Sequence, residues 1–158
     1  MFYLYHSLRV VNKVPEFKLR IENGDVYEYE QISGSITVMR NNETFGFIYF
    51  DYETDFDVFS SKVKQLINNE KSNTGLRLEF GLTNVIHYSV LPGINFTSLQ
   101  HAQTLNGDTV PKIVFGKYQF INGQVFLPLA VHVHHGLCDG LHVETFINLF
   151  QSSMELDH

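Results

Sequence analysis

Histidine side chains are concentrated in one short stretch near the C-terminal end of the chain. Residues 131–142 read VHVHHGLCDGLH, in which His134 and His135 are followed by Cys138, Asp139 and Gly140. An imidazole titrates near neutral pH, so a histidine at the end of a strand can take a proton from a hydroxyl and return it to a leaving group. The glycines at 136 and 140 favour a tight turn, because glycine adopts backbone conformations that other residues avoid. The stretch therefore predicts a rigidly held general base.

Two other interpretations of these histidines stay open. Along a strand, His132 and His134 point to one face and His135 points to the other. His132 and His134 could present two imidazoles to a zinc ion, with Asp139 or His142 as a third ligand, although this spacing is not a standard zinc pattern. The remaining interpretation is structural, with polar residues at a strand end near the surface.

The elements that must position this stretch follow from the hydrophobic pattern. Apolar residues at helical spacing predict helices over 2–12, from the capping residue Asp55 through Ile67, and from Leu141 onward. Alternating or aromatic-rich stretches, with Asn-Gly turns at 23–24 and 122–123, predict strands over 17–21, 26–29, 35–39, 44–52, 85–90, 94–101, 112–120 and 124–135. Residues 68–74 are expected to be polar and flexible. The pattern predicts one domain over 1–158, an α/β (α+β) sandwich with a mostly antiparallel mixed sheet flanked by helices.

The composition excludes several classes of protein. With 158 residues, 44% hydrophobic and 18% charged, the chain is expected to be a soluble globular domain. A net charge of −6 argues against a nucleic-acid partner. The single cysteine, Cys138, excludes an internal disulfide and predicts a cytoplasmic location. No apolar run reaches membrane-spanning length, and the start has no features of a signal peptide.

The histidine stretch resembles the HHxxxDG signature of CoA-dependent acyltransferases, and it is most similar to the chloramphenicol acetyltransferase family. The resemblance covers almost the whole chain, in order and at compatible spacing. Its segments are VNKVPEFKLRIENGD (11–25), SVLPGINFTSLQH (89–101) and FGKYQFINGQVFLPLAVHVHHGLCDG (115–140). It implies a CoA-dependent acyltransferase fold, acetyl-CoA as co-substrate without a metal, and chloramphenicol or a similar small molecule as acceptor, which means antibiotic inactivation.

The resemblance also implies a role for individual residues. His135 matches the general base that deprotonates the acceptor hydroxyl, and Ser89 matches a serine that donates a hydrogen bond to the tetrahedral oxyanion. Asp139 matches a structural aspartate, which pairs with an arginine and fixes the turn that carries the histidine. Lys117 and Tyr118 match cofactor-binding positions, and an ammonium group suits the CoA phosphate. The implied acceptor-binding residues are Phe96, Leu99 and His101.

Three positions depart from the family pattern. The family's tryptophan after the proline is Gly93 here, and a threonine that supports the oxyanion through water is Val114. His101 stands where the family has an apolar residue of the acceptor pocket. These departures bear on the identity of the acceptor more than on the chemistry. An acyltransferase for another hydroxylated acceptor is therefore an alternative.

Family members begin with a further segment, which supplies the arginine partner of the aspartate and part of the acceptor pocket. None of Arg9, Arg20, Arg40 and Arg77 falls at the partner's position, so the chain is expected to leave a buried Asp139 unpaired, at a cost of several kcal/mol. An N-terminally truncated chain is expected to be marginally stable and weakly active, and an inactive homologue is a further alternative. The family's assembly is a homotrimer with its sites at subunit boundaries, and we expect the same here.

Overall fold

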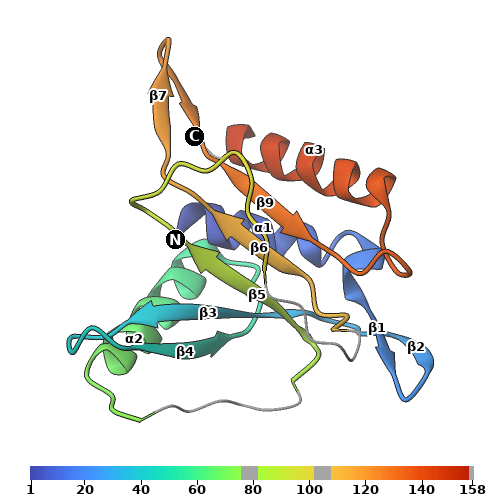
Figure 1. The fold of residues 1–158 in the computed structure, drawn as a ribbon, viewed down its shortest axis with the longest axis horizontal. Helices are drawn as coiled ribbons and strands as arrows, with labels where there is room; N and C mark the ends of the chain where they lie inside the picture. The colour runs from blue at the N-terminus through green and yellow to red at the C-terminus, as the bar shows by residue number, and fades with distance from the viewer. Residues whose placement is uncertain (76–81, 102–107, 157–158) are drawn as a thin grey trace.

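The computed structural model describes residues 1–75, 82–101 and 108–156. A five-stranded sheet with the order β4-β3-β5-β6-β9 is covered on one face by helices (Figure 1). The helices are α1 (Phe2–Val11), α2 (Phe56–Lys71) and α3 (Gly140–Leu156). The sheet strands are β3 (Ser33–Met39), β4 (Phe45–Phe50), β5 (Val85–Val90), β6 (Lys112–Phe115) and β9 (Leu129–His132).

Two hairpins complete the fold. The first pairs β1 (Leu19–Glu22) with β2 (Asp25–Glu28), and the second pairs β7 (Gln119–Ile121) with β8 (Gln124–Phe126). Among the described strands, β3 with β5 and β5 with β6 are parallel, and every other pairing is antiparallel. The predicted fold class is therefore confirmed. None of the helices within the described ranges is long and apolar enough to cross a membrane.

Aromatic side chains fill the core between the helices and the sheet. Phe17, Phe59 and Phe146 are fully buried, and the rings of Phe17 and Phe146 stack at 4.8 Å between centroids. Tyr88 and Phe115 stack at 6.1 Å on neighbouring strands. Each buried aromatic side chain contributes about 1.5–3 kcal/mol from the area it removes from water. Part of the aromatic content of the chain, 14% of its residues, is thus used in the core.

Several predicted element boundaries are wrong. Residues 94–101 form no strand, and the strand before them, β5, already pairs with β3 on one edge and β6 on the other, so it offers them no free edge. The predicted long hairpin is interrupted at Gly116 and Pro128, where the proline has no N–H to continue the ladder. A 3-10 turn η1 (Pro15–Lys18) occupies the start of the predicted first strand, and α2 extends to Lys71 through part of the segment expected to be flexible.

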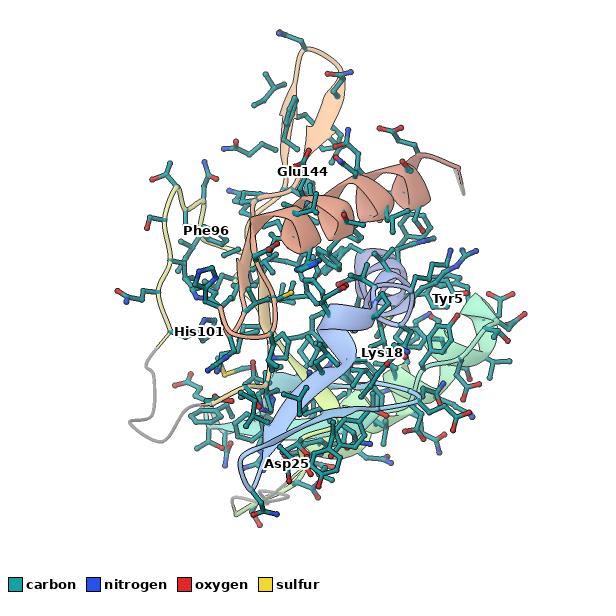
Figure 2. All side chains as sticks on the ribbon, turned by 90° about the vertical axis from the view of Figure 1, so that its right-hand side faces the viewer. Tyr5, Lys18, Asp25, Phe96, His101 and Glu144 are labelled. Atoms are coloured by element: carbon teal, nitrogen blue, oxygen red, sulfur yellow. The ribbon has the colours of Figure 1, made fainter. Side chains whose placement is uncertain are left out.

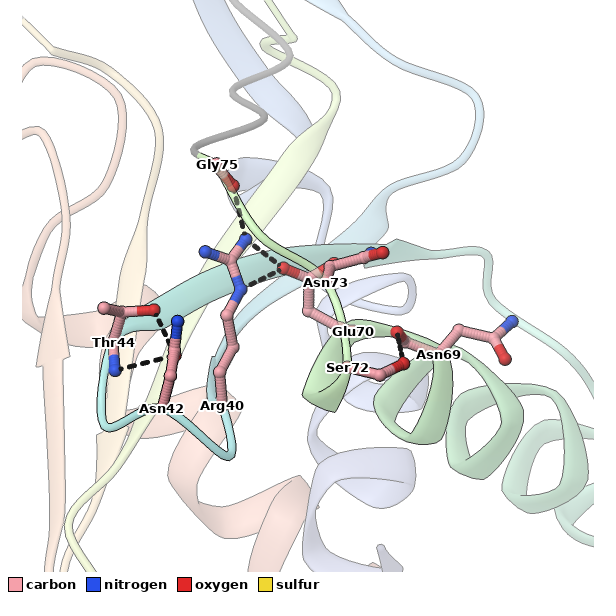
Figure 3. Close-up of polar contacts among 8 residues, drawn as sticks. All are labelled: Arg40, Asn42, Thr44, Asn69, Glu70, Ser72, Asn73 and Gly75. Carbon is pink, nitrogen blue, oxygen red and sulfur yellow. Dashed lines mark hydrogen bonds and ion pairs between the residues drawn. The ribbon is translucent and has the colours of Figure 1, made fainter.

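A buried ion pair closes the C-terminal end of α2 against the turn between β3 and β4 (Figure 3). The Arg40 guanidinium donates to Glu70 Oε1, with Nε at 2.9 Å, and also to the Gly75 carbonyl at 2.8 Å. Asn73 Nδ2 donates to the other oxygen of Glu70 at 2.7 Å. A side chain at Gly46 would fall on the Glu70 carboxylate, so this close approach requires glycine. We call these residues the Arg40–Glu70 corner.

Candidate active site

The histidine stretch forms a tight loop between β9 and α3. Strand β9 ends at His132 rather than continuing to His135 as predicted. Its partner β6 begins at Lys112 opposite His132, and the preceding Pro111 has no N–H with which to extend the pairing. The His134 carbonyl accepts hydrogen bonds from the N–H groups of Leu137 at 2.9 Å and Cys138 at 3.0 Å. These two bonds close the turn that displays His135.

His135 lies at the tip of this loop with its imidazole exposed. Within the part of the chain that the structure describes, its side chain makes no hydrogen bond or ion pair. A ring without protein partners is available to an acceptor hydroxyl. The arrangement suits proton transfer to and from a bound molecule.

Asp139 lies where the loop enters α3, and its side chain is 53% exposed. Its Oδ1 accepts from the N–H groups of Leu141 at 3.0 Å and His142 at 3.4 Å, so the carboxylate caps the helix. The expectation of a buried, unpaired carboxylate is wrong, because water and the helix N-terminus solvate this charge. The cost of several kcal/mol therefore does not arise here.

Arg20, one of the arginines considered as a partner, is fully buried elsewhere. Its guanidinium donates to carbonyl oxygens of Thr83 at 2.6 Å, Val85 at 2.7 Å, Phe17 at 2.9 Å and Leu19 at 2.6 Å. Burial lowers its pKa to about 10, so it keeps its charge at neutral pH. Arg20 thus ties β1 to the start of β5 and is satisfied by main-chain carbonyls.

Ser89 lies on β5, on the face of the sheet turned away from the helices. Its neighbours Tyr88 and Val90 belong to the core, and alternation directs Ser89 to the opposite face. Ser89 pairs with Val114 and Val114 with Ala130, so Ser89 and His132 are two strands and two residues apart. Strand spacings place their Cα atoms about 12 Å apart, and His135 lies beyond His132. The structure does not bring Ser89 and His135 together within one chain.

The cofactor candidates lie at the Ser89 end of the sheet. Lys117 follows β6, its side chain is exposed, and its N–H donates to the Ile94 carbonyl at 2.8 Å. Tyr118 is 59% exposed and its ring lies 5.8 Å from that of Phe120. Phe96 packs against Gly116, where an added side chain would approach its ring to 2.9 Å.

The acceptor candidates lie on the segment from Leu91 to His101, beside the sheet (Figure 2). Leu99 is half-buried, and the His101 ring stands edge-on to that of His132 at 4.9 Å between centroids. Burial, followed by the charges of His132 and Lys112, lowers the pKa of His101. The buried Nδ1 of His101 has no hydrogen-bond partner among the described residues. The family's apolar position is thus occupied by an imidazole whose surroundings favour the neutral form.

The two histidines of the zinc interpretation have different neighbours. The His132 ring contacts His101, whereas the His134 ring lies against Gly136, with its Cε1 3.1 Å from where a side chain would begin. Across the described ranges, no three or more His, Cys, Asp or Glu side chains are grouped to hold a metal ion. The arrangement therefore gives the zinc interpretation no support.

The loop geometry also contains a residue whose role the sequence reasoning missed. The sequence offers His142 as a third metal ligand, whereas in the structure its Nδ1 accepts from the Asp139 N–H at 3.1 Å. The spacing of three residues between the two, at the start of a predicted helix, was the sequence pattern that could have indicated this contact.

Comparison with known proteins identifies the family. The family model described as chloramphenicol acetyltransferase matches residues 1–151. The chain belongs to the chloramphenicol acetyltransferase family. It is 32% identical over 152 residues to chloramphenicol acetyltransferase 3 of Escherichia coli, covering 94% of this chain and 71% of the relative. Chloramphenicol acetyltransferase 2 of Haemophilus influenzae is 31% identical over 151 residues, with the same coverage.

Solved structures agree with this family membership. A chloramphenicol acetyltransferase superposes with a TM-score of 0.85 at 27% identity, covering 97% of this chain and 76% of that one. A probable dihydrolipoamide acetyltransferase from Listeria monocytogenes has a TM-score of 0.69 at 14% identity, which shows a shared fold. The fold implied by the HHxxxDG resemblance is confirmed.

Proposed function

We propose that this member of the chloramphenicol acetyltransferase family transfers the acetyl group of acetyl-CoA to a hydroxyl of chloramphenicol. Family membership supports the reaction and its substrates. The observation that carries the proposal is His135, whose imidazole is exposed on a closed turn and makes no hydrogen bond or ion pair with the described residues.

The reaction follows from the chemistry of the candidate residues. His135 removes the proton of the acceptor hydroxyl, and the oxygen attacks the thioester carbonyl. The Ser89 hydroxyl donates to the tetrahedral oxyanion. When the intermediate collapses, the C–S bond breaks and the CoA thiolate takes the proton from the imidazolium. Lys117 attracts the CoA phosphates and Tyr118 contacts the cofactor, so that the thioester reaches the site oriented.

A complete site requires a second copy of the chain. The base and the oxyanion donor must each lie about 3 Å from adjacent atoms of one reacting centre. Ser89 and His135 of one chain are too far apart for this, so we infer a homotrimer in which His135 of one subunit meets Ser89 of its neighbour. The projecting hairpin of β7 and β8 supports such contacts, because Phe120 is 73% and Val125 is 61% exposed.

A second candidate acceptor is favoured by the His101–His132 pair. Two half-buried imidazoles, one with an unpartnered buried nitrogen, offer hydrogen bonds where the family has an apolar pocket residue. Such a pocket discriminates in favour of acceptors with an additional polar group. We therefore propose a more polar hydroxylated molecule as an alternative acceptor to chloramphenicol. We also propose that the protein is a single domain and is located in the cytoplasm.

The purified chain tests both candidates. Release of the CoA thiol is followed with chloramphenicol and with a panel of hydroxylated compounds that carry further polar groups. Chloramphenicol turnover is expected to be measurable, and His101→Leu is expected to increase it relative to turnover of the polar acceptors. Absence of thiol release with every acceptor contradicts the acetyl transfer, and sedimentation as a monomer contradicts the shared site.

A further inference from the structure

The first turn of α3 contains two reciprocal sets of hydrogen bonds. The Asp139 carboxylate accepts from the N–H groups of Leu141 and His142, and the backbone N–H of Asp139 donates to Nδ1 of His142 at 3.1 Å. In a capping box, the side chain of the third helical residue, usually Glu or Gln, accepts a hydrogen bond from the backbone N–H of the capping residue. Here the imidazole of His142 takes that part.

The second nitrogen of His142 faces the turn η1. Nε2 lies 3.5 Å from Oε1 of Glu16, so the ring stands between the start of α3 and a carboxylate of η1. Nδ1 also lies 3.1 Å from Oδ1 of Asp139, a contact that is attractive only when Nδ1 carries a hydrogen. The hydrogen bond from the backbone and this ion pair compete for the same nitrogen. We assign the backbone bond, because a helix N-terminus leaves its N–H groups without acceptors in the helix.

The HHxxxDG loop has little freedom to move independently of these bonds. His134 closes it at one end through its carbonyl, and Asp139 holds the other end at the helix cap. Only three residues separate His135 from Asp139. A displacement of Asp139 is therefore transmitted to His135.

We propose that His142 is a positioning residue for the acetyl transfer, because it ties the loop that carries His135 to η1 through the Asp139 N–H and Glu16. The inference rests on the proposed acetyl transfer. His142 does not touch the reacting groups, so its contribution is to the geometry of attack.

Two substitutions at His142 separate hydrogen bonding from packing. His142→Ala removes the acceptor and is expected to lower kcat by about tenfold or more, since small misplacements of a catalytic group cost up to about 10²-fold. KM for acetyl-CoA is expected to stay within about twofold, because the cofactor residues lie elsewhere. His142→Gln keeps an acceptor for the Asp139 N–H and a donor for Glu16, as in an ordinary capping box, and is expected to restore most of kcat. Glu144→Ala, an exposed change on the same helix, is the control and is expected to leave both constants unchanged.

Hydrogen exchange of the Asp139 amide gives a readout that does not depend on activity. The amide is expected to be protected from exchange in the wild type and in His142→Gln. Protection is expected to be lost in His142→Ala. If that variant does not fold, the bulkier His142→Leu takes its place, with the same expected loss. If the wild type shows no acetyl transfer, the proposed function fails while the exchange result still tests the capping box. The inference is overturned if His142→Gln loses as much kcat as His142→Ala, if His142→Ala keeps kcat within about twofold, or if exchange at Asp139 is the same in all variants.

Discussion

Two carboxylates close helix ends in this protein, and they do so in opposite ways. Glu70, at the C-terminal end of α2, has a side chain that is 8% exposed and forms an ion pair with the charged guanidinium of Arg40. Asp139, at the start of α3, has a side chain that is 53% exposed and receives backbone N–H groups. The Arg40–Glu70 corner is thus the buried corner, and Asp139 with the first turn of α3 is the exposed corner. The end of α2 and the start of α3 lie at opposite sides of the molecule (Figure 1).

Burial explains the difference. A carboxylate removed from water needs an opposite charge and further hydrogen bonds, which Arg40 and Asn73 supply to Glu70. A carboxylate that stays in water needs only the partial charges of a helix N-terminus. The buried corner is therefore structural, whereas the exposed corner stays in contact with solvent and lies beside the candidate base.

The largest expected effect is the loss of acetyl transfer when the candidate base beside the exposed corner is replaced. His135→Ala is expected to lower acetyl transfer by about 10²–10⁴-fold, since it removes the general base. His134→Ala is expected to have a mild effect on turnover, because that ring lies against Gly136 and its contribution to the turn is through the carbonyl. Steady-state kinetics on folded variants measure the contrast. Equal losses from both substitutions would show that the base is wrongly assigned.

The buried corner is expected to dominate stability. Glu70→Ala leaves the Arg40 charge buried without its carboxylate and is expected to cost about 3–5 kcal/mol in free energy of unfolding, measured by urea denaturation. Replacing both residues, as Arg40→Met with Glu70→Leu, is expected to recover most of that loss. The kcat per folded molecule should not change in either case. A single-variant cost below about 1 kcal/mol would mean that this pair behaves as a surface ion pair.

The exposed corner is expected to affect stability little and turnover more. Asp139→Ala is expected to cost about 1 kcal/mol, the usual loss for a helix cap, and also to lower kcat. Asp55→Ala is a matched control, because Asp55 caps α2 through the Val58 N–H at 2.9 Å. It is expected to cost a similar amount of stability and to leave kcat unchanged. A loss of several kcal/mol specific to Asp139→Ala would instead indicate a charged partner for that carboxylate.

The smallest expected effect concerns the thiol next to Asp139. Burial, followed by the charges of Glu16 and Asp139, raises the pKa of Cys138 to about 11. At pH 8 only about one thiol in a thousand is then the reactive thiolate. The wild-type thiol is expected to react slowly with a thiol reagent. The reaction rate is expected to rise a few-fold in Asp139→Ala and to stay unchanged in Asp55→Ala. Fast reaction of the wild type would mean that the exposed corner opens frequently.

Local patterns in the sequence predicted the parts of the fold that depend on local interactions. Helical spacing predicts the three helices that the described residues form, and Asp55 is the predicted cap of α2. Boundaries that depend on distant partners were not predictable. Helix α2 reaches Lys71, where Glu70 meets Arg40 from another element, and β9 stops at His132 because the facing strand starts after Pro111.

The candidate site shows the same division. The histidine stretch predicted His135 as the base, and the family resemblance predicted Ser89 and Lys117; these assignments stay predictions. The distance between Ser89 and His135 depends on the strand order and register, which no local pattern contains. The expectation that Asp139 would be buried was wrong for the same reason, since exposure is a property of the assembled fold.

The ladder between β6 and β9 is bounded by a proline at each end. Pro111 precedes β6, and Pro128 precedes β9. A slip or a single-residue insertion inside the ladder would bring a proline into a paired position and turn every side chain of β9 to the wrong face. The β7–β8 hairpin beyond Pro128 carries no such constraint. An insertion or deletion inside the ladder is therefore expected to be tolerated less than one in the hairpin, because the length of the ladder sets where β9 ends and the loop that carries His135 begins.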